Sequence, residues 1–495
     1  MFKLFFNFNP LLSLSILPLV GIFILLIFIS ENQTNKLKKI SFIFTSFIFL
    51  NSLVLWINFS NNSSFFQFLE IYNLIPYSNF NYSIGLDGIS LFFIILSTFL
   101  INLCVLISWN NIQFFLKEYL ICFLFLEFCL IQVFSVLDIF LFYIFFESVL
   151  IPMFLIIGVW GSRERKIRAA FQFFLYTLIG SFFMLSAVIY IYSTKGTTDL
   201  LILWFTDFSK YSQLILWFMF FFGLAVKIPM VPFHIWLPEA HAEAPTAGSV
   251  ILAGILLKLG GYGFLRFTLP LFPLGCLYFS PLIFLLSLIA VIYGSLTTLR
   301  QIDLKKIIAY SSISHMGFVT LGIFSLNING LEGSIILMLS HGLISSAMFF
   351  CIGVLYDRYG TRIIKYYSGL VQVMPLFTFF FMFFSFSNIS FPGTSSFIGE
   401  FLILVGLIKI SITLTFISLL GVILSASYAI WLLNRISFGV LKTFYSFYFQ
   451  DISRREFFIL FLLAFNVLWI GIYPISFMNI IHFSSFSVFK HLSFN

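Results

Sequence analysis

Long apolar runs constrain the fold of this chain more than any other feature of its sequence. Each run extends for about 20 residues, the length at which a helix crosses the ~30 Å hydrocarbon core of a bilayer. Hydrophobic residues occupy 61% of the 495 positions and charged residues only 9%, so the chain has more apolar surface than a soluble core can bury. The sequence therefore predicts an all-α polytopic membrane protein with about 14 transmembrane helices. The expected spans are residues 11–30, 40–58, 88–108, 117–136, 138–158, 168–192, 213–232, 246–266, 277–298, 305–325, 332–355, 374–407, 411–433 and 456–480.

The connectors between these runs differ in positive charge. Every cation-rich connector falls on the same side in the fourteen-span arrangement, and the connectors 59–87, 193–212, 267–276 and 326–331 on the other side contain few cations. Because cation-rich loops stay on the inner side of a membrane, both termini are expected on the outer face. The net charge of +8 is thus a topology signal and does not indicate a nucleic-acid partner. The cations concerned are Lys36, Lys38 and Lys39; Arg163, Arg165, Lys166 and Arg168; Arg300, Lys305 and Lys306; Arg358, Arg362 and Lys365; and Arg435, Lys442, Arg454 and Arg455.

Prolines interrupt the seventh expected span. Lys227 is followed by Pro229 and Pro232, and Pro238 and Pro245 come shortly afterwards. Proline lacks a backbone donor and stops or kinks a helix, so we expect a break just after Lys227 and a new helix near Pro245. Non-helical backbone at membrane depth is tolerated only against protein or a water-filled cavity. The interruption therefore indicates an interior, hydrated path.

The run 374–407 is too long for one straight helix and contains a second interruption. Pro392 and Gly393 lie in its middle, and Glu400 follows them. The two interrupted spans, the seventh and the twelfth, are separated by five spans, and an odd number of helices inverts each copy of a repeat. We therefore expect two inverted five-helix units, as in many transporters. The expected division is an N-terminal three-helix segment (1–116), a first half-channel unit (117–266), a second inverted unit (277–434) and a C-terminal helix and tail (435–495).

Charged residues inside the spans are the candidates for chemistry. Glu147 and Lys227 are each placed in strongly apolar sequence, and a buried carboxylate beside a buried lysine is favoured as an ion pair. A neutral carboxyl satisfied by Ser148 is the alternative for Glu147. Lys258 lies deep in its run, although a lysine can also extend its ammonium to a surface. Glu127 is a further buried acid, ranked below Glu147 because no helix break accompanies it.

Two histidines, His315 and His341, lie in runs opened by serine and glycine. Imidazole, with an ordinary pKa near ~6.5, is the side chain best able to pass protons at neutral pH. Either histidine could instead be a hydrogen-bonded core residue. Together with Glu147, Lys227, Lys258 and Glu400 they form the candidate proton path.

No sequence pattern indicates a metal or redox centre in the chain. His234, Glu239, His241 and Glu243 surround the prolines, but their spacing fits no zinc site, and a polar loop closing the inner mouth of the path is the plainer interpretation. The five cysteines include no C-x-x-C pair, and haem, iron–sulfur and phosphate-binding motifs do not occur. The expected metal and cofactor content of the chain itself is none.

Several long blocks carry a specific resemblance. From about residue 80 the chain resembles the chain 4 family of mitochondrial NADH:ubiquinone oxidoreductase, respiratory complex I. The blocks are LFYIFFESVLIPMFLIIGVWGSRERKIRAAFQFFLYTLIGS, AVKIPMVPFHIWLPEAHAEAPTAGSVILAGILLKLGGYGFLRF, TTLRQIDLKKIIAYSSISHMG and PGTSSFIGEFLILVG. The resemblance implies an antiporter-like subunit of the membrane arm, which moves protons in the inner mitochondrial membrane beside other membrane-arm subunits, including neighbouring antiporter-like chains. NADH, FMN, iron–sulfur clusters and ubiquinone are expected in other subunits.

The resemblance also implies a role for each candidate residue. Glu147 falls on the acid of the family's fifth helix, Lys227 on its broken-helix lysine and Lys258 on its eighth-helix lysine. Glu400 falls on the twelfth-helix acid, where sister chains have a lysine. His315 and His341 fall on histidines between the two half-channels. Two other readings stay open: a structural spacer that conducts nothing, which the retained charges disfavour, and a subunit of a bacterial-type cation/proton antiporter.

Overall fold

The computed structural model describes residues 9–73, 81–442 and 450–493, and these pack as two compact units. Unit 1 consists of Met1–Lys227, Lys258–Phe279 and Asn479–Asn495, and unit 2 of Ile228–Leu257 and Ser280–Met478. The expected division into an N-terminal three-helix segment, two half-channel units and a C-terminal helix and tail stays a prediction. The two ends of the chain lie outside the described residues, so their side of the membrane stays a prediction.

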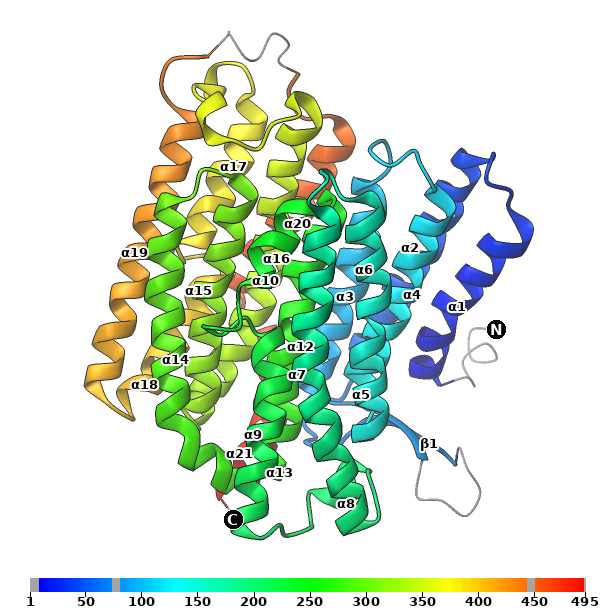
Figure 1. Cartoon of the computed structure of the whole chain (residues 1–495), viewed down its shortest axis with the longest axis vertical. Coiled ribbons are helices and arrows are strands. Elements are labelled where there is room, and N and C mark those ends of the chain that lie inside the picture. Colours follow the sequence, from blue (N-terminus) through cyan, green and yellow to red (C-terminus); the bar gives the residue numbers. More distant parts are fainter. Residues whose placement is uncertain (1–8, 74–80, 443–449, 494–495) are drawn as a thin grey trace. The chain divides into compact units, whose positions relative to one another are not determined.

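Unit 1 is built mainly of apolar helices around α4, which packs against α1, α2, α3, α5 and α6 (Figure 1). A second group joins α7 to α5, α6 and α9. The N-terminal elements are α1 (Pro10–Phe28), α2 (Thr34–Asn58), β1 (Gln67–Asn73), β2 (Asn81–Leu86), α3 (Gly88–Ile107) and α4 (Leu116–Ser135). They are followed by α5 (Ile139–Ser148), α6 (Leu150–Trp160), α7 (Lys166–Lys195), α8 (Leu200–Leu203) and α9 (Lys210–Lys227).

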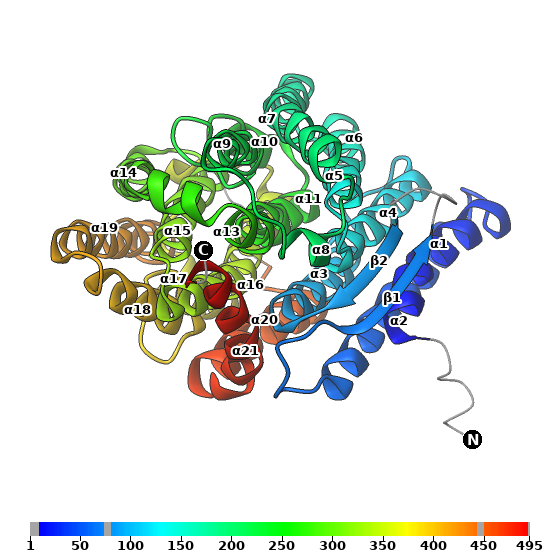
Figure 2. The same ribbon diagram turned by 90° about the horizontal axis from the view of Figure 1, so that it is seen from below.

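A β-hairpin lies in the connector after α2, where the sequence predicts only a connector with few cations. β1 and β2 pair antiparallel, with Tyr72 opposite Tyr82, and the strands lie side by side in Figure 2. The β1 sequence QFLEIYN does not alternate strictly between apolar and polar residues, so the pattern alone does not mark it as a strand. The fold is mostly helical, with this small sheet as its exception.

Unit 2 is organised around the long buried helix α16, which packs against α11, α15, α17, α18 and α20 (Figure 1). The first of its two chain segments, Ile228–Leu257, contains α10 (Trp236–Glu243), α11 (Thr246–Ile251) and the π-helix η2 (Leu252–Leu256). The later elements are α15 (Leu304–Phe324), α16 (Ile328–Tyr359), η4 (Ile364–Tyr366), η5 (Leu370–Gln372), α17 (Pro375–Asn388), α18 (Ser395–Ile408), α19 (Ile412–Ser437) and α20 (Arg454–Ile472).

Five further elements begin or lie near the points where the chain passes between units. They are α12 (Leu257–Gly263), the π-helix η3 (Phe264–Thr268), α13 (Leu269–Leu271) and α14 (Pro273–Arg300), with α21 (Ile475–Ser493) near the chain end.

Glycines allow α16 and α18 to approach closely. A Cβ on Gly333 of α16 would lie 2.8 Å from the backbone nitrogen of Ile403, and a Cβ on Gly399 of α18 would lie 2.8 Å from the nitrogen of Leu337. Such distances leave no room for a side chain at either position. The residue after Gly399 is Glu400, so this contact holds the part of α18 that carries Glu400 close to α16.

Twelve helices of the described residues are long and apolar enough to cross a membrane. The two expected spans outside this set are the seventh and the twelfth. In the seventh, α9 ends at Lys227, and in the twelfth, the apolar sequence is divided between the shorter helices α17 and α18. Ser390 and Gly393, between α17 and α18, both adopt positive φ.

The last predicted span, 456–480, is wrong in its boundaries. The structure ends α20 at Ile472 and begins α21 at Ile475. Pro474 lies between them, and Tyr473 caps α20 with non-helical backbone angles. The apolar run continues across the proline, so composition alone does not reveal the break. α21 is an additional helix that the sequence reading missed.

In unit 1, a short backbone bridge joins the start of α5 to the chain after α7. The amide of Ile139 donates to the carbonyl of Thr198 at 3.0 Å, and the amide of Leu200 donates to Leu137 at 2.9 Å. Asp138 caps α5 through its side chain and accepts a hydrogen bond from the Thr198 hydroxyl at 2.6 Å. These bonds fix the entry of the helix that carries Glu147.

In unit 2, the same arrangement joins the start of α15 to the chain after α16. The amide of Leu304 donates to the carbonyl of Arg362 at 2.9 Å, and the amide of Ile364 donates to Ile302 at 3.1 Å. Asp303 caps α15 as Asp138 caps α5. The bridge fixes the entry of the helix that carries His315.

Candidate functional site

Lys227 and Glu147 lie together in unit 1, as the sequence predicts. The Lys227 Nζ is 4.0 Å from Glu147 Oε1, and the side chains are 6% and 20% exposed. The ammonium also donates to the carbonyl of Phe146 at 2.6 Å and lies 3.1 Å from the centre of the Phe146 ring. We call Lys227, Glu147 and Phe146 the lysine–glutamate cluster. The Lys227 ammonium thus interacts with the Glu147 carboxylate, the Phe146 carbonyl and the Phe146 ring. Of these three partners, the charged carboxylate stabilises the protonated lysine most strongly.

Local breaks in two helices build this cluster. α9 ends at Lys227, two residues before Pro229. On the other side, the helix is interrupted at Val149 between α5 and α6, and Pro152 lacks the amide that would bond to Ser148. The carbonyl of Phe146 lies just before this interruption and accepts from Lys227 instead. Both partners are therefore presented by helix ends, which can move at lower cost than a helix interior.

Lys258, a residue of unit 1, is fully buried at 0% exposure. The alternative in which its ammonium extends to a surface is therefore wrong. Its helix segment α12 lies between the π-helices η2 and η3. A π-helical turn carries an extra residue and is frequent at functional sites. The sequence shows no signal for these turns beyond the small residues near Gly254 and Gly263.

Glu400 and both histidines lie together in unit 2. His315 Nδ1 is 3.2 Å from Glu400 Oε1, and the rings of His315 and His341 are 5.6 Å apart between centres. Tyr428 OH lies 3.5 Å from His315 Nε2, and the Asn388 amide donates to the Tyr428 hydroxyl at 3.4 Å. We call these five residues the histidine cluster. All five are nearly inaccessible to solvent.

Sequence reasoning missed Tyr428 and Asn388. Asn388 is the last residue of α17, directly before the interrupted stretch, and an amide beside a break is a usable signal. Tyr428 lies in an ordinary apolar run among other aromatic residues, and nothing in that run distinguishes it. Both ring nitrogens of His315 therefore face a titratable or hydroxyl group, so a proton can enter at one nitrogen and leave at the other.

A buried ion pair in unit 1 was also missed. Arg266 Nη2 is 2.6 Å from Asp87 Oδ1, and Arg266 Nε donates to the Tyr262 hydroxyl at 3.2 Å. Asp87 is the N-cap of α3, so its carboxylate is already fixed by the Ser90 amide. The pair joins the start of α3 to the segment after Lys258 within unit 1.

Glu127, the second-ranked acid, is fully buried in α4. Within the described residues, neither of its carboxylate oxygens has a hydrogen-bond partner. Among the described residues, no cation lies within ion-pair distance of Glu127, and its rank below Glu147 stays a prediction.

The segment around Glu239 is a buried helix, so the prediction of a polar loop is wrong. α10 runs from Trp236 to Glu243, and its His241 ring stacks on Phe349 at 4.7 Å. The high alanine content of this segment favours a helix despite Pro238, which lies in the first turn where a missing amide costs nothing. Burial against unit 2 helices supplies the rest of the stabilisation.

The polar residues of α10 bind separate partners and do not converge on a metal position. Glu239 accepts from Lys306 at 2.6 Å, and Glu243 Oε1 lies 3.4 Å from Arg362. Among the described residues, no three His, Cys, Asp or Glu side chains are grouped so that they could hold a metal ion.

Comparison with known proteins places the chain in a family. Residues 137–427, more than half of the chain, match the family described as NADH:quinone oxidoreductase/Mrp antiporter, TM. NADH-ubiquinone oxidoreductase chain 4 of Chondrus crispus is 66% identical over 486 residues, covering 98% of this chain and 99% of that protein. The same chain of Marchantia polymorpha is 56% identical, covering 99% and 98%. The chain belongs to the NADH-ubiquinone oxidoreductase chain 4 family.

Solved structures agree with membership of the chain 4 family. A chain of respiratory complex I from Thermus thermophilus with bound NADH is 29% identical, has a TM-score of 0.88 and covers 97% of this chain and 99% of its own length. A chain of the Mrp complex from Dietzia is only 17% identical but has a TM-score of 0.84, covering 97% and 98%. The second likeness concerns the fold alone. The resemblance stated from the sequence is confirmed.

Proposed function

We propose that this chain translocates protons as a membrane-arm subunit of NADH:ubiquinone oxidoreductase, while other subunits oxidise NADH and reduce ubiquinone. The observation that carries the proposal is the lysine–glutamate cluster. A charged pair 4.0 Å apart in the interior of a membrane protein is costly, and a subunit that only filled space would be more stable with apolar residues there. The family membership supports the same conclusion.

The membrane topology belongs to this proposal. The twelve long helices, together with one span that ends with α9 at Lys227 and one formed by α17 and α18, give fourteen spans. The two breaks would then carry Lys227 and Glu400. The bridges before α5 and α15, each with a capping aspartate and a partner segment after the following helix, support two related five-helix units.

The proposed proton path uses the buried groups in the order Lys227, Lys258, the two histidines and Glu400. Lys227 is held or released by Glu147, and the histidine cluster delivers the proton to Glu400. Each group on the path is buried, which keeps the path separate from lipid. The placement of His315 between Glu400 and Tyr428 supports relay through its ring.

The family membership supports a proposal for the setting of the subunit. We infer an inner mitochondrial membrane location with both termini in the intermembrane space, contacts with other membrane-arm subunits, and FMN, iron–sulfur clusters and ubiquinone in other chains. The two alternatives from the sequence are a subunit of a bacterial-type cation/proton antiporter and a non-conducting spacer, and the family membership favours neither of them.

The test is proton pumping by the intact complex in vesicles after Lys227→Met. Electron transfer should persist, while the number of protons moved per electron should fall. Lys210→Met is the matched control, because Lys210 lies at the exposed start of the same helix. An unchanged ratio in the Lys227 variant would support the spacer reading, and transport that requires sodium in the wild type would support the antiporter reading.

A further inference from the structure

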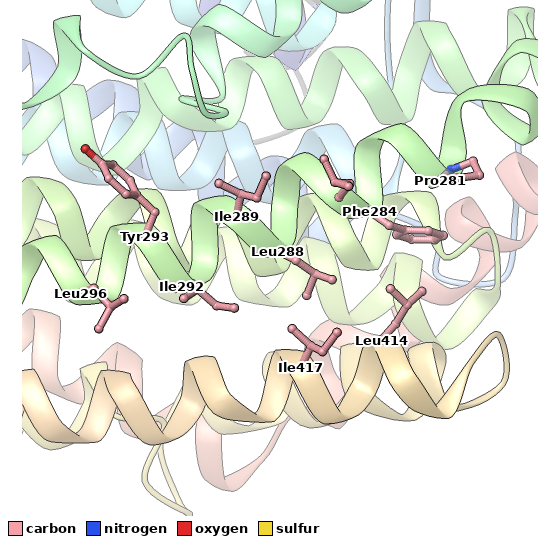
Figure 3. A pocket seen from close by; sticks show the side chains of 10 residues that line it. Pro281, Phe284, Leu288, Ile289, Ile292, Tyr293, Leu296, Leu414 and Ile417 are labelled. Carbon is pink, nitrogen blue, oxygen red and sulfur yellow. The ribbon is translucent and has the colours of Figure 1, made fainter.

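An apolar groove runs between α14 and α19 in unit 2. It has a volume of about 670 Å³, and its wall is formed by residues from Pro281 to Leu296 of α14 and by Leu414 and Ile417 of α19. Figure 3 shows Leu288 of α14 directed toward the side chains that rise from α19. The lining is almost entirely hydrocarbon, so the groove suits an acyl chain and offers no site for a polar ligand.

A cationic pocket of about 550 Å³ lies at the C-terminal ends of the same two helices. Its lining includes Arg300 at the end of α14, Arg435 near the end of α19, and Lys365 and Lys442 from the connectors. All four side chains are exposed. Among the described residues, no carboxylate forms an ion pair with Arg300, Lys365 or Arg435. None of the described residues that line the pocket is acidic.

Helix geometry makes the pocket a continuation of the groove. Leu296 of the groove and Arg300 of the pocket are four residues apart on α14, so they share a face. Ile417 and Arg435 are separated by a whole number of turns on α19 at ~3.6 residues per turn, so they also share a face. The two helices therefore run in the same direction along one site, with hydrocarbon at one end and cations at the other.

The groove is long enough for an acyl chain from one leaflet of a membrane. From Pro281 to Leu296 the groove follows α14 for ~22 Å at ~1.5 Å per residue. Half of the hydrocarbon core is ~15 Å thick, so an acyl chain from one leaflet fits along the groove. Trp431 lies under Arg435 at 4.2 Å from the guanidinium, at the depth where aromatic residues usually mark the membrane interface.

We propose that α14 and α19 hold an anionic phospholipid, with one acyl chain in the groove and the phosphate in the cationic pocket. A zwitterionic lipid would fill the groove equally well but would gain less from Arg300, Lys365 and Arg435, which form no ion pair with a carboxylate of the described residues. Basic pockets between transmembrane helices on the inner side are a recognised type of anionic headgroup site. The proposal does not depend on the proton path.

The experiment uses the intact complex in nanodiscs of phosphatidylcholine. A trace of photoreactive phosphatidylglycerol or of phosphatidylcholine with the same photoreactive acyl chain is added, and labelled peptides are mapped. The anionic probe should label the peptides around Leu288 and Ile417 in clear preference to the zwitterionic probe. Arg300→Gln with Arg435→Gln should lower that preference about 30-fold, which is about 2 kcal/mol at about 1 kcal/mol per cation.

The matched control is the double variant Arg163→Gln and Arg165→Gln, which removes two exposed cations predicted on the same side of the membrane. It should leave the preference unchanged. Equal labelling by both probes in the wild type would overturn the proposal, as would an equal fall in the control variant. Crosslinking of the groove to another protein chain, with no lipid labelling, would also overturn it, because the occupant would then be a helix of a neighbouring subunit.

Discussion

Glu147→Gln should uncouple electron transfer from proton pumping while the complex stays assembled. Glutamine keeps the size of the side chain but removes its charge from beside Lys227. At the observed 4.0 Å and an effective dielectric of about 20, the attraction between the two charges is about 4 kcal/mol. Moving a proton against ~150 mV requires about 3.5 kcal/mol. Making and breaking this one pair is therefore sufficient in magnitude to drive the step.

The partners that remain after the Glu147→Gln change cannot replace the lost charge. Lys227 would still donate to the Phe146 carbonyl and face the Phe146 ring, and a cation–π contact contributes about 0.5 to 2 kcal/mol. Neither partner can be switched off by protonation. The variant complex should thus still oxidise NADH but move fewer protons per electron, because this chain no longer contributes to pumping.

Glu147→Asp should give an intermediate result, which tests the calculated attraction between the carboxylate and the Lys227 ammonium. A side chain shorter by one methylene places the charges about 5.5 Å apart and lowers their attraction to about 3 kcal/mol. That energy supports pumping only up to about 130 mV. The aspartate variant should therefore pump at low membrane potential and stall before the wild type does.

The assay is proton movement by the intact complex in vesicles, with NADH oxidation followed at the same time and the membrane potential set by potassium and valinomycin. Glu127→Gln is the control, since Glu127 is also a buried acid of unit 1 but has no cation within ion-pair distance among the described residues. It should retain most pumping. If Glu147→Gln left the limiting potential at the wild-type value, Glu147 would not control Lys227 and the switch would lie elsewhere.

Three further predictions concern other groups. Tyr428→Phe removes the hydroxyl near His315 Nε2 and should slow pumping several-fold without loss of assembly, as measured by initial rates and by native gel analysis. Lys258→Met should stop pumping while NADH oxidation persists, as measured by proton movement in vesicles, because methionine has a similar volume but cannot carry a proton. Burial lowers the pKa of His234, which lies between α9 and α10, so the folded state disfavours its proton. The stability that neutral His234 contributes is complete above its ordinary pKa of ~6.5 and is lost as pH falls, and His234→Gln should therefore flatten the decrease in melting temperature between about pH 7 and 5.5.

Spans and charged pairs could be predicted because they follow from solvation. A carboxylate and an ammonium in apolar sequence each need a partner, and this requirement predicts the pairing of Lys227 with Glu147 from the sequence alone. The helix stop at Lys227 follows from proline chemistry in the same way. These inferences need only local sequence and the cost of burying charge.

The missed features depend on packing between distant segments. α10 is a helix because its alanines bury against unit 2, and the break at Pro474 is hidden inside a continuous apolar run. The π-helices on either side of the segment that carries Lys258 have no strong signal in the sequence. Tyr428 joins the histidine cluster only because α19 brings it there.

The lysine–glutamate cluster and the histidine cluster have different roles in the proposed proton transport. In the lysine–glutamate cluster, a full ion pair gives a large energy difference between joined and parted states, which suits the step that works against the membrane potential. In the histidine cluster, Glu400 and Tyr428 face opposite nitrogens of His315, so the ring can take a proton on one side and release it on the other with little movement. A relay must bind a proton only weakly and a switch must bind it strongly in one state. The family resemblance places Glu400 where sister chains have a lysine. This difference agrees with the division of roles, because a carboxylate beside an imidazole can complete a proton relay, whereas two cations side by side would block it.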